Sequence, residues 1–332
     1  MTRGTWAGRT VLVTGALGFI GSHFVERLAA EDATVIGLYR GDRPSIRSEL
    51  ATLAGDRLRL ARVDLGDEHE TRAAFRYLAP HIDAVFHCAA LDGNAQYKRE
   101  HSAEILDANV RTTANLLNCA REVDVDNVLL LSSSEVYCAP DASPASEDED
   151  VRRSPQYTEN GYVLSKIFGE IIADQHQRQF ATRLFRIRPG NVYGPRDSAA
   201  GAHHRVIPSM VARAAAGEKI EIWGDGSQTR SFIHAADLVR CVLQVVETGK
   251  YEVVNIGSAE EVSILELAHE VATALGVPSR VSTDPSRPAG APVRRLDLTR
   301  MREVTDVEPR TLRAGLEDTV RWYRRNERPQ PK

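Results

Sequence analysis

Tyr162 and Lys166, together with a run of serines upstream, have the types and the spacing that proton and hydride chemistry needs. Tyr162 and Lys166 stand four positions apart in YVLSK, so on a helix both would point into one site. A nearby ammonium lowers the pKa of a phenol, which makes tyrosinate accessible as a base for hydride transfer. Three serines, Ser132, Ser133 and Ser134, lie upstream in SSSEVY at the predicted end of a strand, where a serine hydroxyl can bind the same substrate oxygen.

A glycine-rich turn supplies the second chemical feature. Gly15, Gly18 and Gly21 lie in TGALGFIG, between a predicted strand and a predicted helix that also brings Phe19 and Ile20 to the turn. Gly15 permits the tight turn, Gly18 lets the backbone approach a pyrophosphate, and Gly21 allows close packing of helix on strand. The spacing predicts a dinucleotide site at the first helix N-terminus.

The next strand indicates which dinucleotide is bound. An acidic residue at its end would hold the ribose 2′-hydroxyl of NAD, but the sequence there reads Leu38-Tyr39-Arg40-Gly41. Arg40 can pair with a 2′-phosphate, so we favour NADP over NAD. A solvated loop arginine is the alternative.

These residues require a parallel sheet to bring them together. Short apolar runs alternate with helical patterns through the first half of the chain, which predicts right-handed crossovers and an α/β fold with a doubly wound parallel Rossmann sheet. The predicted strands are 10–13, 34–38, 58–63, 84–88, 127–132 and 183–187, and the main helices are 21–30, 103–122 and 161–179.

The residue composition changes after Pro189, where glycine and proline become frequent. We expect a second, smaller α/β substrate lobe from 189–230 and 257–329, and a Rossmann domain from 1–188 and 231–256. The returning segment is expected to hold a helix at 232–243 and a strand at 253–256.

Composition excludes several classes of protein. The 332 residues carry 42 Lys and Arg against 46 Asp and Glu, so no basic excess indicates a nucleic-acid partner. No apolar run is long enough to span a membrane or form a signal peptide. Four separated cysteines fit a reduced, cytoplasmic protein. His87, His203, His204 and His234 show no metal-ligand spacing, so we expect no metal.

Taken together, the motifs resemble the extended short-chain dehydrogenases/reductases that act on nucleotide-diphosphate sugars. The resemblance rests on TGALGFIG, FHCAA, SSSEVY, YVLSK, RPGNVYGP and WGDGSQTRSFIH in family order. It implies that Ser133 and Tyr162 polarise and protonate the substrate, while Lys166 binds the nicotinamide ribose. It also implies cofactor contacts at Asp64, Leu65 and Ala89, and substrate contacts at Ser134, Asn191 and Arg230, the last two on the diphosphate.

The second lobe is most similar to GDP-fucose synthases and GDP-mannose 3,5-epimerases. The likeness lies in RVIP, which begins at Arg205, and in SRPAGAP, which contains Arg287, so both arginines are expected to bind substrate and GDP is favoured as the nucleotide. The synthases carry an acid/base histidine at the position of Arg205, although His203 and His204 directly precede it.

Glu135 leaves the reaction open. The run Ser133-Ser134-Glu135 resembles a motif of sugar-nucleotide 4,6-dehydratases and decarboxylases, whose glutamate removes the C5 proton. Many C4-epimerases carry a glutamate at this position without using it in the reaction. We favour a nucleotide-sugar epimerase with transient hydride transfer at C4. The alternatives are a dehydratase or decarboxylase with Glu135 as base, a 4-keto-sugar epimerase or reductase, and an inactive NADP(H) sensor. The family also implies a homodimer through 103–121 and 161–178.

Overall fold

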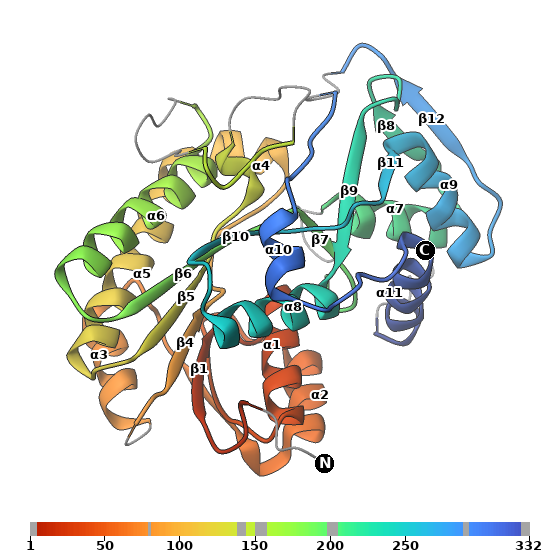
Figure 1. The fold of residues 1–332 in the computed structure, drawn as a ribbon. Coiled ribbons are helices and arrows are strands. Elements are labelled where there is room, and N and C mark those ends of the chain that lie inside the picture. Colours follow the sequence, from red (N-terminus) through yellow and green to blue (C-terminus); the bar gives the residue numbers. More distant parts are fainter. Residues whose placement is uncertain are drawn as a thin grey trace.

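The computed structural model describes residues 5–78, 81–137, 144–149, 158–197, 205–287 and 292–326. Its centre is a seven-stranded parallel sheet in the order β10-β6-β5-β4-β1-β2-β3 (Figure 1). The strands are β1 (Thr10–Thr14), β2 (Thr34–Tyr39), β3 (Leu58–Arg62), β4 (Ala84–His87), β5 (Asn127–Leu131), β6 (Arg183–Pro189) and β10 (Val253–Ile256). This is the doubly wound α/β fold that the sequence predicts.

Helices cover both faces of the sheet, which explains why its strands are apolar on both sides. One face packs on α1 (Phe19–Ala30), α2 (Pro44–Ala54), α8 (Ala235–Thr248) and α10 (Thr299–Val304). The other packs on α3 (Glu68–Tyr77), α5 (Ser102–Glu122) and α6 (Gly161–Gln179). The short helix α4 (Ala95–Glu100) and the turns η1 (Gly55–Arg57) and η2 (Ser134–Val136) lie in the connections.

A smaller lobe lies beside the carboxyl end of the sheet (Figure 1). It holds a three-stranded sheet, β7 (Asn191–Tyr193), β9 (Thr229–His234) and β11 (Glu261–Ser263), and a parallel pair, β8 (Ile220–Trp223) and β12 (Val281–Asp284). The helices α7 (Val206–Ala215), α9 (Ile264–Leu275) and α11 (Leu312–Asn326) pack on these strands around a separate apolar core.

The predicted start of one helix is wrong. The helix expected at 232–243 begins only at Ala235, because Phe232, Ile233 and His234 belong to β9 and pair with β7. His234 then caps α8 by accepting a hydrogen bond from the Ala236 amide at 3.3 Å. None of the described helices is long and apolar enough to cross a membrane.

A buried ion pair joins α6 to the sheet. Arg188, on β6, donates to both carboxylate oxygens of Glu170 at 2.9 and 2.6 Å, and both side chains are almost fully buried. The Ser132 hydroxyl, just after β5, donates to Glu170 at 2.6 Å. Arg188 also donates to the Tyr137 hydroxyl at 2.8 Å. These bonds fix α6 against the ends of two neighbouring strands.

Arg188→Met is expected to lower the free energy of unfolding by about 3–5 kcal/mol, because it leaves the Glu170 carboxylate buried without its cation. Urea-induced unfolding measures this loss. Arg27→Met, which breaks the exposed pair with Glu31, is the control and should cost less than about 1 kcal/mol. Equal losses in the two variants would contradict the importance of the buried pair.

Candidate active site

A cavity of about 530 Å³ opens at the carboxyl ends of the parallel strands, between the sheet and the smaller lobe. This is where open α/β sheets place their sites. Most of the predicted site residues line it. They are Gly15, Gly18, Phe19, Ile20, Gly21, Arg40, Asp64, Leu65, Ala89, Ser133, Ser134, Glu135, Tyr162, Lys166, Asn191 and Arg205.

The start of α6 is held in place by side chains on two elements. Asn160 caps the helix, and its side-chain oxygen accepts from the amides of Tyr162 and Val163 at 3.1 and 3.4 Å. The Ser102 hydroxyl, at the start of α5, accepts from the Gly161 amide at 2.8 Å. A Cβ atom at Gly161 would lie 1.9 Å from the Ser102 carbonyl oxygen, so glycine is required for this close approach. Tyr162 therefore enters the cavity from a fixed backbone.

Lys166 follows Tyr162 by one helical turn. Its ammonium donates to the Leu131 carbonyl oxygen at 2.7 Å and lies 5.5 Å from the centre of the Tyr162 ring. Burial lowers the pKa of Lys166 to about 8. The Ser133 hydroxyl accepts from the Glu135 amide at 3.1 Å, which fixes the serine at the end of β5 beside the phenol.

The electrostatics of Tyr162 differ from the expectation. The pKa of its phenol lies well above the usual value of a tyrosine, because burial and the nearby carboxylates of Asp92 and Glu135 disfavour phenolate. Arg205 and a hydrogen bond with Ser133 act in the opposite direction without outweighing them. The prediction that a cation makes tyrosinate accessible is wrong here, since it counted Lys166 but neither the burial of the phenol nor the two carboxylates.

The glycine turn before α1 fits a dinucleotide pyrophosphate. Gly15 has a φ of +65°, and a Cβ atom at Gly21 would lie 2.2 Å from the Gly15 carbonyl oxygen, so both positions need glycine. The first turn of α1 has no side-chain cap and no acidic residue. Its amides and positive dipole end therefore face the cavity without a competing anion.

The end of β2 offers positive charge to this cavity. Arg40, which is exposed, and Arg43, which is half-buried, both line it. Arg43 donates to the carbonyl oxygens of Leu17 and Arg196 at 3.4 and 3.3 Å. Arg43 carried no separate prediction from the sequence, although its position three residues after Arg40 is itself a signal for a 2′-phosphate site.

The lobe contributes Asn191 and Arg205 to the cavity wall. The Asn191 amide donates to the Ser231 carbonyl oxygen at 2.9 Å. Arg230 and Arg287 do not line the described part of the cavity. Burial and the charge of Arg294 lower the pKa of Arg230 to about 10, whereas Arg287 lies over the Trp223 ring at 4.9 Å.

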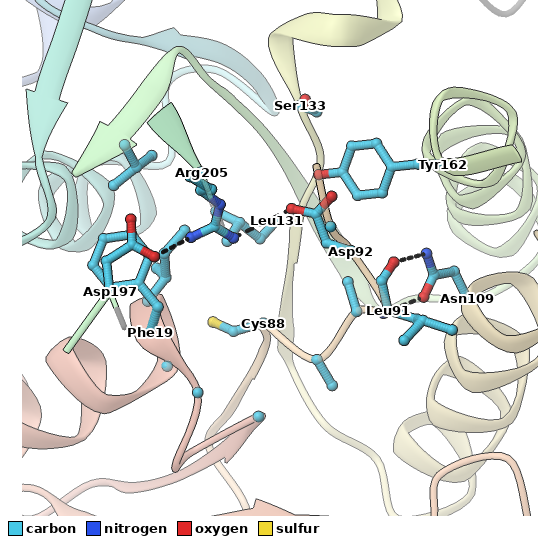
Figure 2. Close-up of a pocket in the computed structure, with 18 of the residues that line it drawn as sticks. Phe19, Cys88, Leu91, Asp92, Asn109, Leu131, Ser133, Tyr162, Asp197 and Arg205 are labelled. Atoms are coloured by element: carbon cyan, nitrogen blue, oxygen red, sulfur yellow. Dashed lines mark hydrogen bonds and ion pairs between the residues drawn. The ribbon is translucent and has the colours of Figure 1, made fainter. Parts of the chain in front are cut away.

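The sequence analysis also missed Asp92 and Lys98, which are charged residues in the same cavity. Asp92 follows β4 and Lys98 lies on α4, where no family motif marks them. The position of Asp92 beyond the carboxyl end of a parallel strand was the available signal. Figure 2 shows Asp92 between Tyr162 and Arg205.

His203 and His204 lie outside the described residues. Within the described part of the chain, no three His, Cys, Asp or Glu side chains lie close enough together to hold a metal ion. The described cavity thus combines a phenol, a buried ammonium and a dinucleotide turn, which are the parts needed to move a proton at an oxygen while hydride moves at its carbon.

Comparison with known proteins supports this chemistry. The model of the NAD dependent epimerase/dehydratase family matches residues 11–257. A dTDP-4-dehydro-6-deoxy-D-allose reductase of Streptomyces bikiniensis is 61% identical over 328 residues, covering 99% of this chain and 100% of the relative. A UDP-glucose 4-epimerase of Mycolicibacterium smegmatis is 33% identical over 94% of this chain and 98% of its own.

Solved structures share the fold across the whole chain. The dTDP-glucose 4,6-dehydratase of Streptomyces venezuelae, solved with NAD bound, has a TM-score of 0.82 and 29% identity, covering 96% of this chain and 97% of the other. The UDP-glucose 4-epimerase of Thermotoga maritima, solved with UDP-glucose, has a TM-score of 0.84 and 26% identity, covering 95% and 99%.

Tyr162→Phe should reduce turnover by roughly 10²–10⁴-fold, because it removes the group that exchanges a proton with the substrate oxygen. Binding of the nicotinamide cofactor should be almost unchanged. Steady-state rates and a cofactor titration by fluorescence measure the two effects. Tyr77→Phe, on an exposed residue, is the matched control. Activity of Tyr162→Phe within a few-fold of the unmodified protein would identify another proton donor.

Proposed function

Because this chain belongs to the NAD dependent epimerase/dehydratase family, we propose that it is a nicotinamide-dependent reductase of a dTDP-linked 4-keto-6-deoxysugar. The observation that carries the proposal is 61% identity over the full length of a dTDP-4-dehydro-6-deoxy-D-allose reductase. A second relative with the same description is also 61% identical over 328 residues. The 4-keto group of dTDP-4-dehydro-6-deoxy-D-allose is therefore the reacting group that we propose.

This proposal replaces the C4-epimerase that the motifs favoured and adopts one of its alternatives. The epimerase relative shares 33% identity, about half the value of the reductases. Ser133, Tyr162 and Lys166 do not distinguish the two reactions, since both pass hydride at C4. The inactive sensor is the least favoured alternative, because all three of these side chains are present and line one cavity.

The roles of the chain's own groups follow from their positions. A bound reduced nicotinamide would supply the hydride for the sugar C4 carbon. Ser133 hydrogen-bonds the C4 carbonyl oxygen, and Tyr162 transfers its phenol proton to that oxygen as the C=O π bond becomes a C–H and an O–H bond. Lys166 holds the nicotinamide ribose and stabilises the phenolate until solvent returns the proton.

The ion pair that Glu135 makes with Lys98 fits reduction better than dehydration. Its carboxylate accepts from the Lys98 ammonium at 2.9 Å, and Lys98 is buried. This contact occupies one of the two carboxylate oxygens of Glu135. A 4-keto reduction removes no proton from carbon, so in this proposal Glu135 holds Lys98 instead of acting as a base.

The nucleotide and the cofactor complete the proposal. The reductase relatives are named for a dTDP substrate, whereas a GDP-L-fucose synthase of Escherichia coli is 28% identical, so we propose dTDP in place of the GDP that the lobe segments favoured. The family and two structural neighbours are associated with NAD. Arg40 and Arg43 at the end of β2 support NADPH as the preferred donor of this chain.

Three further features remain proposals. Arg230 binds the diphosphate, together with Asn191 and Arg205. The chain divides into a Rossmann domain of 1–188 with 231–256 and a substrate lobe of 189–230 with 257–329. Two copies of the chain pair through α5 and α6, where Phe168 is an exposed apolar side chain on α6.

Incubation with NADPH and a panel of 4-keto-6-deoxysugars linked to dTDP, GDP and UDP tests the function. We expect one equivalent of NADPH to be consumed for each dTDP-6-deoxysugar formed, because reduction consumes the hydride. Absorbance of the reduced nicotinamide and NMR of the product measure this ratio. NADPH deuterated at the transferred position should place one deuterium on the sugar C4 carbon.

Other products would contradict the reductase. An inverted C4 hydroxyl without net consumption of NADPH would indicate an epimerase, and loss of water from a dTDP-hexose would indicate a dehydratase. No reaction with any sugar, despite tight cofactor binding, would indicate a sensor.

Arg40→Ala should raise the KM for NADPH about tenfold or more and leave the KM for NADH nearly unchanged, because only NADPH carries the 2′-phosphate. Initial rates with each cofactor measure the two constants. Arg59→Ala, an exposed change on β3 away from the cavity, is the control. An equal change in both constants would exclude a role for Arg40 in reading the 2′-phosphate.

A further inference from the structure

Five charged side chains form a continuous series across the cavity, in the order Glu135, Lys98, Asp92, Arg205 and Asp197. The Lys98 ammonium lies 2.9 Å from the Glu135 carboxylate and 3.1 Å from that of Asp92. Arg205 lies 3.2 Å from Asp92 and 3.0 Å from Asp197. The series connects η2, α4, the segment after β4, the start of α7 and the segment after β7, so it crosses from the sheet to the lobe. Figure 2 shows its Asp92, Arg205 and Asp197 side chains.

Asp92 occupies the centre of this series. One of its carboxylate oxygens pairs with Lys98 and the other with Arg205. Burial raises the pKa of Asp92, but the charges of Lys98 and Arg205 outweigh it and hold this pKa below the usual value. Asp92 therefore carries a full negative charge inside the cavity.

Lys98 contacts the ring of Tyr162. Its ammonium is 3.9 Å from the centre of the Tyr162 ring, a close cation–π contact, and the side chain is buried. Without Asp92 and Glu135, a buried ammonium at this position would lack an anionic partner within the described residues. The two carboxylates thus place Lys98 against the ring.

We propose that Asp92 and Lys98 are positioning residues for the reduction: Asp92 holds Lys98 against the Tyr162 ring and Arg205 across the cavity, and the opposed charges of the pair set how firmly Tyr162 keeps the proton that it donates. The inference rests on the proposed function, because only a reduction begins with a protonated phenol and a ketone.

The two charges act in opposite directions on Tyr162 and Lys166. The Asp92 carboxylate raises the pKa of both groups, while Lys98 lowers the pKa of Lys166 and, as a cation on the ring, stabilises phenolate. Rates of reduction fall at high pH as these groups lose their protons. Asp92 therefore moves the high-pH limit of activity to higher pH, and Lys98 moves the same limit to lower pH.

Charged and titratable groups reach Tyr162 and Lys166 from every element packed against them. They are His87 at the end of β4, Cys88 and Asp92 after β4, Lys98 on α4, Glu135 on η2, Glu170 on α6 and Arg205 at the start of α7.

Asp92→Asn should move the high-pH limb of kcat/KM for the 4-keto sugar to lower pH by about one unit, because it removes a negative charge beside both groups. Lys98→Met should move the same limb to higher pH. The pH profiles of both variants, measured with saturating NADPH, give the two shifts. Asp107→Asn and Lys250→Met remove charges from exposed ion pairs and should leave the limb unchanged.

An ultraviolet difference titration of phenolate gives a second readout that needs no substrate. Subtracting the same titration of Tyr162→Phe isolates Tyr162, whose phenolate should appear at lower pH in Asp92→Asn than in the unmodified protein. Asp92→Glu keeps the charge and should restore the unmodified behaviour in both measurements.

The outcomes separate the two proposals. If the unmodified protein reduces no 4-keto sugar, the proposed function fails, and the phenolate titration still tests the positioning role. Limb positions that do not change, or that move in the same direction in Asp92→Asn and Lys98→Met, would overturn the inference. So would a phenolate titration that Asp92→Asn leaves unchanged.

Discussion

The buried contact between Arg188 and Glu170 is the constraint on which the site depends. Glu170 stands four residues after Lys166 and eight after Tyr162, so all three lie along one face of α6. Arg188 binds Glu170 from β6, and Ser132 binds it from the end of β5, one residue before Ser133. One carboxylate thus fixes both the helix that carries the phenol and the strand end that carries the serine. A slip of α6 by one residue would rotate Tyr162 out of the cavity and break this contact.

A second set of charges, inside the cavity, determines what the fixed groups can do. Lys166 lies between the two sets, since it donates to the Leu131 carbonyl oxygen on β5 while its ammonium lies near the Tyr162 ring. Asp92 contacts both a residue of α4 and a residue that begins α7. The position of the lobe is therefore coupled to the charge beside the phenol.

Much of this arrangement could be predicted from the sequence, because it depends on local patterns. The alternation of strands and helices predicts the parallel sheet, the glycine spacing predicts the turn before α1, and the predicted helix at 161–179 matches α6 at both ends. Prediction failed where a distant segment decides the outcome. Phe232 reads as the start of an apolar helix, yet pairing with β7 makes it a strand residue.

The raised pKa of Tyr162 could not be predicted from the sequence for the same reason. The fourfold spacing of Tyr162 and Lys166 shows the cation, but the carboxylates of Asp92 and Glu135 come from segments that only the folded chain brings to the ring. The burial of Lys98 could not be predicted from the sequence, since a lysine on a six-residue helix is usually solvated. Burial of that lysine follows from its two carboxylate partners, and each lies in a different connection of the sheet.

The difference between reduction and epimerisation lies outside the shared motif. An epimerase uses its tyrosine first as a base and then as an acid, so neither protonation state can be strongly favoured. A reductase uses the phenol as an acid in every turnover, and carboxylates beside the ring favour that state. On the proposed function, Ser133, Tyr162 and Lys166 position the hydride chemistry, and the charges of Asp92, Lys98 and Glu135 would favour the direction of reduction.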